Sequence, residues 1–326
     1  MKTFTQSEET KEVHLLFSGL QVYFVSKLNA LALQFGEGKS TKSVSWDCDK
    51  GKHGEGKHYE ARDKSLFNQA SVAVSHIHYE DNKNKVLEYL LAFSSTIHPE
   101  NPHVPSLHLS MSREKLKGHK ACWKLVADFN PSILNEASLD QNIFLHTLEK
   151  SAGNFYEEGI DKGNSYFYID EVDRYRGVSH YYLEDYRGRN FEEEKLFILA
   201  LYESLIECYL DIVSAKLRLH PSYTLEKKEE QLAYHTLYLF QVLIQDRDTR
   251  VALLECDKND LGVLASLPSE INRDILSLWG EKMTDTQNLL LKKILKVLPK
   301  VVPTPIDDKC KKKLANTLRK HYKNTL

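Results

Sequence analysis

A short segment, Ile97–His108, combines three histidines with three prolines in twelve residues. Each proline fixes its own φ near about −65° and biases the preceding residue towards an extended conformation, so the segment cannot be a helix. Imidazole moves protons near neutral pH and also binds metal ions, so rings held by a stiff backbone are candidates for catalysis or metal binding. A proline-rich surface loop with incidental histidines explains the same pattern, and this segment alone does not separate the two interpretations.

The order of motifs along the chain resembles that of the oxygen-dependent coproporphyrinogen III oxidases of haem biosynthesis. In that family the proline-rich stretch reads approximately His-Pro-x-Asn-Pro-x-Val-Pro-Thr-x-His, and here it reads His-Pro-Glu-Asn-Pro-His-Val-Pro-Ser-Leu-His. The other segments that resemble family motifs, in the same order, are Phe67–His78, Ala127–Pro131, Tyr166–Asp185, Asp246–Thr249 and Ser266–Pro268. The resemblance extends from about Trp46 to Pro268. It implies an α+β fold, a large antiparallel sheet flanked by helices on both faces, and a homodimer.

The resemblance also implies an enzyme that uses O2 to turn propionate side chains of coproporphyrinogen III into vinyl groups by oxidative decarboxylation. It assigns catalytic roles to Asp128, which would contact pyrrole nitrogens, and to His108, which would move a proton. Arg176 can hold a propionate through two parallel hydrogen bonds. The other residues implied at the substrate site are Ser94, Ser110, Met111 and Ser112. Each assignment has a structural alternative: Asp128 suits a turn, His108 an exposed strand position, and Arg176 an ordinary ion pair.

The implied reaction uses O2 as a co-substrate and requires no organic redox cofactor, and the sequence contains no glycine-rich nucleotide-binding motif. A metal is a separate question. His98 and His108 match the family's pair of histidines, for which metal binding has been proposed, and two histidines with a carboxylate form a known type of metal site. Relatives are generally regarded as metal-independent, so the resemblance favours a reaction without a metal. It leaves a divalent metal at His98 and His108 open as the alternative.

Several positions at the implied pocket depart from the family pattern. The triple glycine that precedes the aspartate is replaced by Lys124–Val126, and a later Gly-Gly pair is replaced by Ser179–His180. Glycines allow a flat ligand to approach the backbone, so the side chains of Lys124–Val126 predict a pocket narrower than a porphyrinogen requires. Lys124 can instead bind a propionate as a point charge, while the family's arginine falls at Ser112, with Arg113 facing the other side. The alternatives are therefore a diverged paralogue that oxidises a smaller substrate, or a non-catalytic tetrapyrrole-binding protein.

The composition is that of an ordinary globular protein, with 41% hydrophobic and 28% charged residues among 326. The formal net charge of -2 gives no general attraction to nucleic acid or to anionic membranes. Five cysteines without Cys-x-x-Cys spacing favour reduced thiols in the cytoplasm. The apolar segment Val13–Phe35 is interrupted by polar residues, so we expect a helix and no membrane span.

Periodicity predicts the elements that position the candidate residues. The predicted strands are Ser71–Tyr79, Leu87–Thr96, Ser106–Ser110, Trp123–Phe129, Tyr166–Ile169, Val178–Leu183, Leu237–Ile244 and Arg250–Leu254. The predicted helices are Val13–Phe35, a long helix capped by Asn190 and running to Leu217, and Glu226–Tyr234, while Gly36–Lys57 is predicted to be a loop. We expect one domain over residues 1–283 and a basic helical extension over residues 284–326. A solvated appendage is a simpler interpretation of this extension than a nucleic-acid-binding arm.

Overall fold

The computed structural model describes residues 7–255 and 259–323. Its centre is a seven-stranded sheet with the order β1-β2-β3-β4-β5-β6-β9, in which all neighbours are antiparallel. The strands are β1 (Lys42–Cys48), β2 (Gly54–Glu60), β3 (Phe67–His78), β4 (Leu87–Pro99), β5 (Ser106–Leu116), β6 (Cys122–Asn130) and β9 (Ser179–Tyr186). The first six strands follow one another in the chain, and β9 extends the sheet at one edge.

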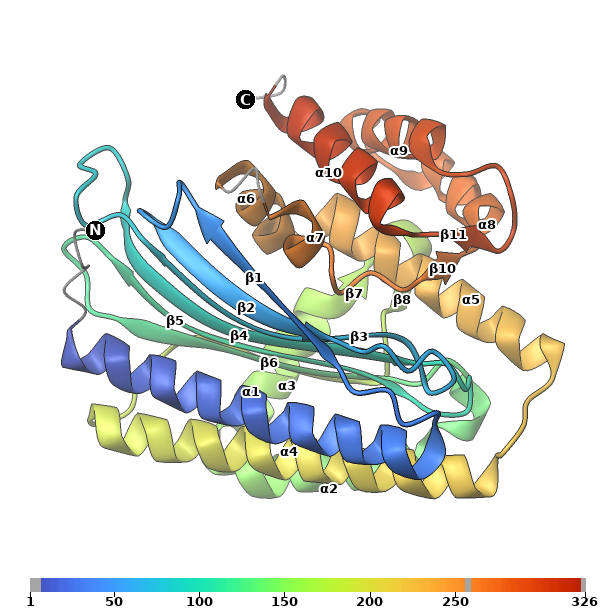
Figure 1. Ribbon diagram of the computed structural model, residues 1–326, viewed down its shortest axis with the longest axis horizontal. Helices are drawn as coiled ribbons and strands as arrows, with labels where there is room; N and C mark the ends of the chain where they lie inside the picture. The colour runs from blue at the N-terminus through green and yellow to red at the C-terminus, as the bar shows by residue number, and fades with distance from the viewer. Residues whose placement is uncertain (1–6, 256–258, 324–326) are drawn as a thin grey trace.

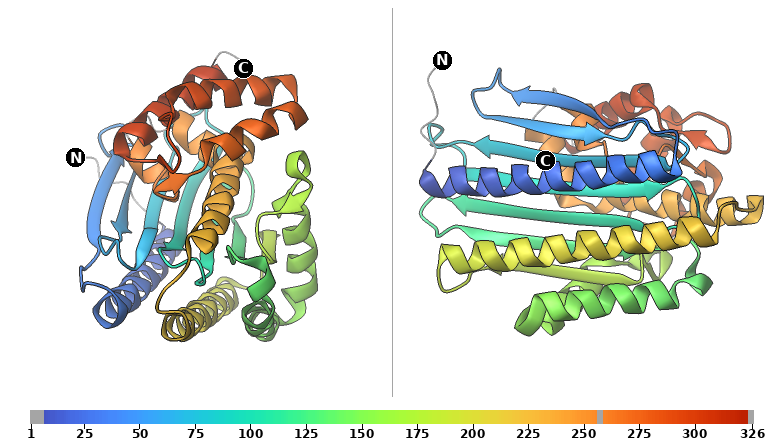
Figure 2. Two further views of the ribbon diagram at one scale, coloured as in Figure 1. Left: turned by 90° about the vertical axis from the view of Figure 1, so that its right-hand side faces the viewer. Right: turned by 60° about the horizontal axis from the view of Figure 1, so that its bottom comes forward.

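One face of the sheet is covered by long helices (Figures 1 and 2). These are α1 (Glu8–Phe35), α2 (Ser138–Ala152) and α4 (Phe191–Leu219), and α3 (Tyr156–Phe167) packs along the edge strand β9. Among the described helices, α1 is the one long and apolar enough to cross a membrane. Its apolar residues Val13, Phe17 and Phe24 are fully buried against the sheet and α4, so packing of the core accounts for its composition.

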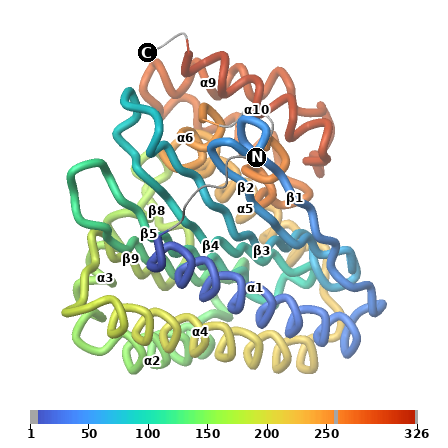
Figure 3. The backbone as a smooth tube through the Cα atoms, turned by 60° about the vertical axis from the view of Figure 1, so that its left-hand side comes forward, coloured from blue at the N-terminus to red at the C-terminus, as the bar shows by residue number. Residues whose placement is uncertain are grey.

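The other face of the sheet carries a second helical layer, which Figures 1 and 3 show beyond the strands, opposite α1 and α4. The helices of this layer are α5 (Leu225–Phe240), α6 (Arg247–Glu255), α7 (Asp260–Val263), α8 (Arg273–Leu278), α9 (Asp285–Val297) and α10 (Asp308–Lys323). Short strand pairs accompany them: β7 (Tyr168–Ile169) with β8 (Arg174–Tyr175), and β10 (Glu270–Ile271) with β11 (Thr304–Pro305). Helices α9 and α10, from the predicted extension, share a hydrophobic core with α5 that includes Phe240, Leu290 and Leu314.

The structure confirms the predicted α+β class and the antiparallel sheet with helices on both faces. Residues 72–77, 106–110 and 181–183 are strands of that one sheet, as the sequence predicted. The cap of the long helix is also as predicted, because the side chain of Asn190 accepts a hydrogen bond from the backbone N–H of Glu193 at 2.9 Å. The division at residue 283 stays a prediction.

Three predictions of local structure are wrong, and a fourth is half right. Gly36–Lys57 contains β1 and most of β2, and the exposed, polar side chains of this hairpin gave no apolar alternation to detect. Leu237–Ile244 and Arg250–Leu254 are helical rather than extended. The end of α5 is buried on all sides, so its apolar run lacks the 3.6-residue period and is indistinguishable from a buried strand. In Tyr166–Ile169 the first two residues end α3, and the last two form the short strand β7.

Candidate functional site

A row of polar side chains crosses four strands on the sheet face that α5 covers. The antiparallel register places Thr96 of β4 opposite His108 of β5, His108 opposite Asp128 of β6, and Asp128 opposite His180 of β9. Directly opposed residues project to the same face of a sheet. Residues far apart in the sequence therefore become lateral neighbours because of the register.

Asp128 is the centre of this row, and its side chain is fully buried. Its Oδ2 accepts hydrogen bonds from Arg176 Nε at 2.7 Å and from Asn130 Nδ2 at 2.8 Å, with a further contact from Arg176 Nη2. Its Oδ1 lies 2.6 Å from Nδ1 of His180. A buried carboxylate requires such partners, because an unpaired charge is costly to remove from water.

Arg176 reaches Asp128 from the loop that follows β8. Its backbone N–H donates to the carbonyl of Phe167 at 3.2 Å, and its guanidinium lies over the rings of Phe167, at 4.4 Å, and Tyr238, at 5.1 Å. The next residue, Gly177, must be a glycine here, because a Cβ would lie 2.7 Å from the carbonyl oxygen of Phe129. This close approach allows the loop to bring the arginine down onto the sheet.

The electrostatics of the row fix which groups carry charge. Burial alone would raise the pKa of Asp128, but Arg176 and the hydrogen bond from His180 hold it well below its usual range. Burial, reinforced by the nearby charge of Arg176, lowers the pKa of His108 to about 4. Arg176 Nη2 lies 3.2 Å from His108 Nδ1 and can only donate, so Nδ1 accepts and Nε2 carries the proton. The result is an ionised Asp128–Arg176 pair beside a neutral imidazole that can donate a hydrogen bond from Nε2.

His98 lies beside the row, at the end of β4. Its Nε2 faces the carbonyl of Ser266 at 3.1 Å and its Nδ1 faces the hydroxyl of Ser106 at 3.0 Å, which together describe a neutral ring. Its ring packs edge-on against Tyr238 at 4.6 Å, and burial lowers its pKa to about 3. Because both nitrogens of His98 are engaged, the geometry adds no support for a metal held by His98 and His108, and that site stays a prediction.

The serines predicted at the substrate site lie on the same sheet face as the row. Ser94 of β4 is opposite Ser110 of β5, and Ser112 is opposite Lys124 of β6. Ser94 and Ser110 are half-buried and Ser112 is buried, so small side chains lie beside His108 on this face. Met111 differs from the prediction: the alternation of β5 directs it to the opposite face, where it is 1% exposed in the core under α1 and α4.

His180 belongs to the site although the sequence predicts no role for it and shows only that it replaces a glycine of the family pattern. Its Nδ1 bonds Asp128, while its Nε2 is buried and has no hydrogen-bond partner among the described residues. Only the pairing register of β6 with β9 could have revealed this position. Lys124 lies on the same face and pairs with Asp248 at 2.6 Å, whereas Leu125 points into the opposite core. Of the three side chains that replace glycines before Asp128, only Lys124 and Val126 therefore face the site.

Comparisons with known proteins identify the family of the chain. The family model described as coproporphyrinogen III oxidase matches residues 12–294. The mitochondrial oxygen-dependent coproporphyrinogen-III oxidase of Homo sapiens is 25% identical over 262 residues, which cover 73% of this chain and 56% of the human protein. The Rickettsia felis enzyme of the same name is 26% identical over 185 residues, 56% of this chain and 64% of that protein. The chain thus matches less than two thirds of the length of these relatives. It belongs to the coproporphyrinogen III oxidase family.

Proposed function

We propose that the protein catalyses O2-dependent oxidative decarboxylation of the propionate side chains of a porphyrinogen, converting coproporphyrinogen III to protoporphyrinogen IX in haem biosynthesis. The observation that supports this best is the hydrogen-bonded cluster of Asp128, Arg176 and His108, in a chain of this family. The cluster combines a carboxylate for pyrrole N–H groups, a cation for a carboxylate, and a proton donor.

Substrate binding in this proposal is an exchange of partners. Arg176 is held by Asp128 in the free protein, and a propionate would take over the guanidinium through two parallel hydrogen bonds. The released carboxylate of Asp128 would then accept the pyrrole N–H groups. After the exchange the guanidinium is paired with the propionate, and the Asp128 carboxylate is hydrogen-bonded by the pyrrole N–H groups together with Asn130 and His180, so neither charge is left without partners.

The reaction balances with O2 as the only oxidant. The ring-adjacent carbon of the propionate gives a hydrogen with its electron pair to O2, and electron-rich pyrrole, polarised by Asp128, stabilises the positive charge that remains. The carboxylate then leaves as CO2, and the electrons of the broken C–C bond form the vinyl double bond. One proton completes hydrogen peroxide, and His108 would relay it by giving up the proton on Nε2 as Nδ1 takes one up from solvent, so that the ring ends neutral.

An aerobic incubation of the pure protein with coproporphyrinogen III tests the proposal, with products separated and weighed by mass spectrometry. We expect a product lighter by one CO2 and two hydrogens for each converted propionate, and none under nitrogen. Asp128→Asn should lower conversion by about 10²–10⁴, whereas Asp161→Asn on the exposed surface of α3 serves as the matched control. Unchanged substrate with the folded protein in air would contradict the proposal.

The second candidate function is that of a diverged paralogue with a smaller substrate, and His180 favours it. The ring lies 5.3 Å from Phe167 and 5.5 Å from Tyr175, in place of a glycine of the family pattern. This imidazole occupies space beside Asp128 that a macrocycle would use. His180→Gly separates the candidates: conversion of coproporphyrinogen III that only the variant performs favours the paralogue. Tight binding of coproporphyrin III without conversion by either protein favours a non-catalytic tetrapyrrole-binding protein.

We also propose that the protein is a cytoplasmic homodimer that needs no metal for this reaction. A groove between α1 and α4 combines apolar side chains, of which Leu15 and Leu196 are 69% and 68% exposed, with the charged side chains Glu12, Glu192, Lys195 and Glu203. Exposed apolar side chains bordered by charged ones are typical of an interface. Light scattering of the eluted protein should give twice the chain mass, and Leu196→Glu should give the monomer.

A further inference from the structure

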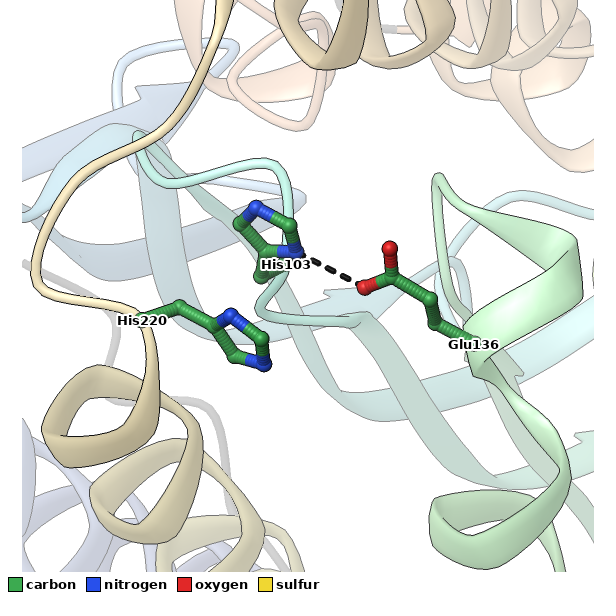
Figure 4. A group of neighbouring side chains, drawn as sticks. All are labelled: His103, Glu136 and His220. Carbon is green, nitrogen blue, oxygen red and sulfur yellow. Dashed lines mark hydrogen bonds and ion pairs between the residues drawn. The ribbon is translucent and has the colours of Figure 1, made fainter.

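Three side chains with metal-binding atoms converge outside the row of polar residues described above. His103, Glu136 and His220 offer two imidazoles and a carboxylate whose ligand atoms all lie within 4.8 Å of one another. Figure 4 shows that they approach from three separate segments and point toward a common space. His103 belongs to the loop between β4 and β5, Glu136 ends the 3-10 turn Leu134–Glu136 after β6, and His220 caps the C-terminus of α4.

The backbone around this cluster is held in place by one buried side chain. The amide of Asn101, 8% exposed, accepts the backbone N–H of His103 at 3.0 Å and donates to the backbone carbonyl of His220 at 2.7 Å. Prolines flank His103 at positions 102 and 105, and Pro221 follows His220. The two histidines are therefore tethered to each other through their main chains before any ligand binds, which lowers the entropic cost of bringing them together.

The side chains themselves are close to a ligating arrangement. His103 Nδ1 lies 2.8 Å from Glu136 Oε2, and the rings of His103 and His220 stack at 4.1 Å with an angle of 8° between planes. Parallel rings direct their in-plane lone pairs side by side, so sharing one ion requires a ring to turn about χ2, a soft torsion. Lys227 Nζ lies 3.6 Å from Glu136 Oε1 and competes for the carboxylate, although Glu230 offers it another partner at 2.8 Å.

We propose that His103, Glu136 and His220 bind one divalent transition-metal ion of the zinc class, with water completing its coordination. Two imidazole nitrogens with one carboxylate are a typical zinc ligand set, whereas calcium and magnesium prefer oxygen ligands throughout. The three residues are half-buried, so water can reach the ion. His220 lies in the connection from α4 to α5, which joins the two helical layers, and the ion would fix this connection to the loop that leads into β5. Its role is structural and independent of the proposed reaction.

Zinc titration of the chelator-treated full-length protein, followed by calorimetry, tests this site. We expect one zinc ion per chain, a zinc-dependent rise in the unfolding temperature, and visible ligand-field bands when cobalt replaces zinc. His220→Ala and Glu136→Gln should each weaken zinc binding at least about tenfold, since a ligand loss should cost no less than a supporting residue. His119→Ala, which removes an exposed histidine from the hairpin between β5 and β6, should leave the affinity unchanged.

Lys227→Met gives a prediction of opposite sign. Removing the ammonium that competes for Glu136 should tighten zinc binding, an effect that a purely structural stack of two histidines would not produce. Absence of stoichiometric zinc binding, or equal affinity in wild type, His220→Ala and Glu136→Gln, would overturn the proposal. Either result leaves the decarboxylation proposal untouched, because that reaction is measured separately.

Discussion

Each face of the central sheet buries one arginine–carboxylate pair, and the two pairs have different surroundings. Under α1 and α4, Arg113 Nη1 donates to Glu194 Oε2 at 2.8 Å and its Nε donates to Glu9 at 2.9 Å. The indole N–H of Trp123 donates to the same Glu194 oxygen at 2.8 Å, and the guanidinium lies 4.9 Å from the indole ring. The pair is also contacted by the ring of Phe191 and by the backbone N–H of Gly188, and no histidine among the described residues contacts it.

Under α5, Arg176 and Asp128 form a pair of the same kind, but imidazoles border it. His108 contacts the guanidinium and His180 contacts the carboxylate. A ring that changes charge a few pH units from neutrality can receive or deliver a proton, which an indole cannot. We therefore expect a buried ion pair bordered by imidazoles to take part in chemistry, and one bordered by aromatic rings to stabilise the fold.

The largest effect is expected at the Asp128–Arg176 pair. Asp128→Asn keeps the shape of the side chain but removes the charge that polarises the pyrrole, so turnover of coproporphyrinogen III should fall by about 10²–10⁴. Steady-state rates per folded molecule measure this. Glu194→Gln, the equivalent change on the other face, is the control and should keep its rate. Wild-type rates in Asp128→Asn would remove the functional difference between the faces.

The next largest effect is a loss of stability, expected at the Arg113–Glu194 pair. Arg113→Met leaves Glu194 buried without its cation, so the free energy of unfolding should fall by about 3–5 kcal/mol. Urea denaturation followed by circular dichroism measures the change. The double variant Arg113→Met with Glu194→Leu removes both charges and should recover most of the loss, and a double variant as unstable as the single one would argue against this explanation.

His108, which contacts Arg176, predicts a pH dependence of stability. His108 is neutral in the folded protein, with a pKa lowered to about 4 from its ordinary value of 6.5. The unfolded chain therefore binds more protons between these values, and stability should fall by up to about 3 kcal/mol as the pH drops from 6.5 to 4. Unfolding free energies of wild type and His108→Asn across this range give the contribution. Parallel pH curves for the two proteins would show that His108 is not the cause.

The smallest effect concerns Lys124, which lies on the same face of the sheet as Asp128. The ion pair of Lys124 with the exposed Asp248 should contribute less than about 1 kcal/mol to stability. If Lys124 binds a propionate, Lys124→Ala should weaken coproporphyrin III binding about tenfold, whereas Asp248→Ala should strengthen binding by freeing the ammonium. Fluorescence titration measures both. Equal affinities in the three proteins would exclude Lys124 from the binding surface.

Much of the sheet could be predicted from the sequence because its central strands alternate or are bounded by proline and turn residues. The ordered motifs also led to Asp128, His108 and Arg176, which the structure brings into contact. The hairpin of β1 and β2 was missed because few of its side chains are buried, and α5 was partly misassigned because nearly all of its second half is. Where nearly all or nearly none of the side chains of a segment are buried, its sequence lacks the periodic alternation of apolar and polar residues that predicts a helix or a strand.

The remainder of the site depends on register, which local patterns do not specify across long connections. His180 lies opposite Asp128 only because β9 pairs with β6 after two intervening helices. The same holds for Met111, whose direction follows from which face of β5 is turned toward α1. A one-residue shift would exchange the faces of either strand, and no motif in the sequence excludes it.

The different roles of the Asp128–Arg176 and Arg113–Glu194 pairs are tested by measuring two quantities for Asp128→Asn and Glu194→Gln. These are the free energy of unfolding and the turnover of coproporphyrinogen III. Both variants break a buried ion pair, so both should lose stability. We expect that only Asp128→Asn also loses turnover per folded molecule, while Glu194→Gln retains the wild-type rate. Equal losses of turnover in the two variants, or a loss confined to Glu194→Gln, would contradict a catalytic role for Asp128.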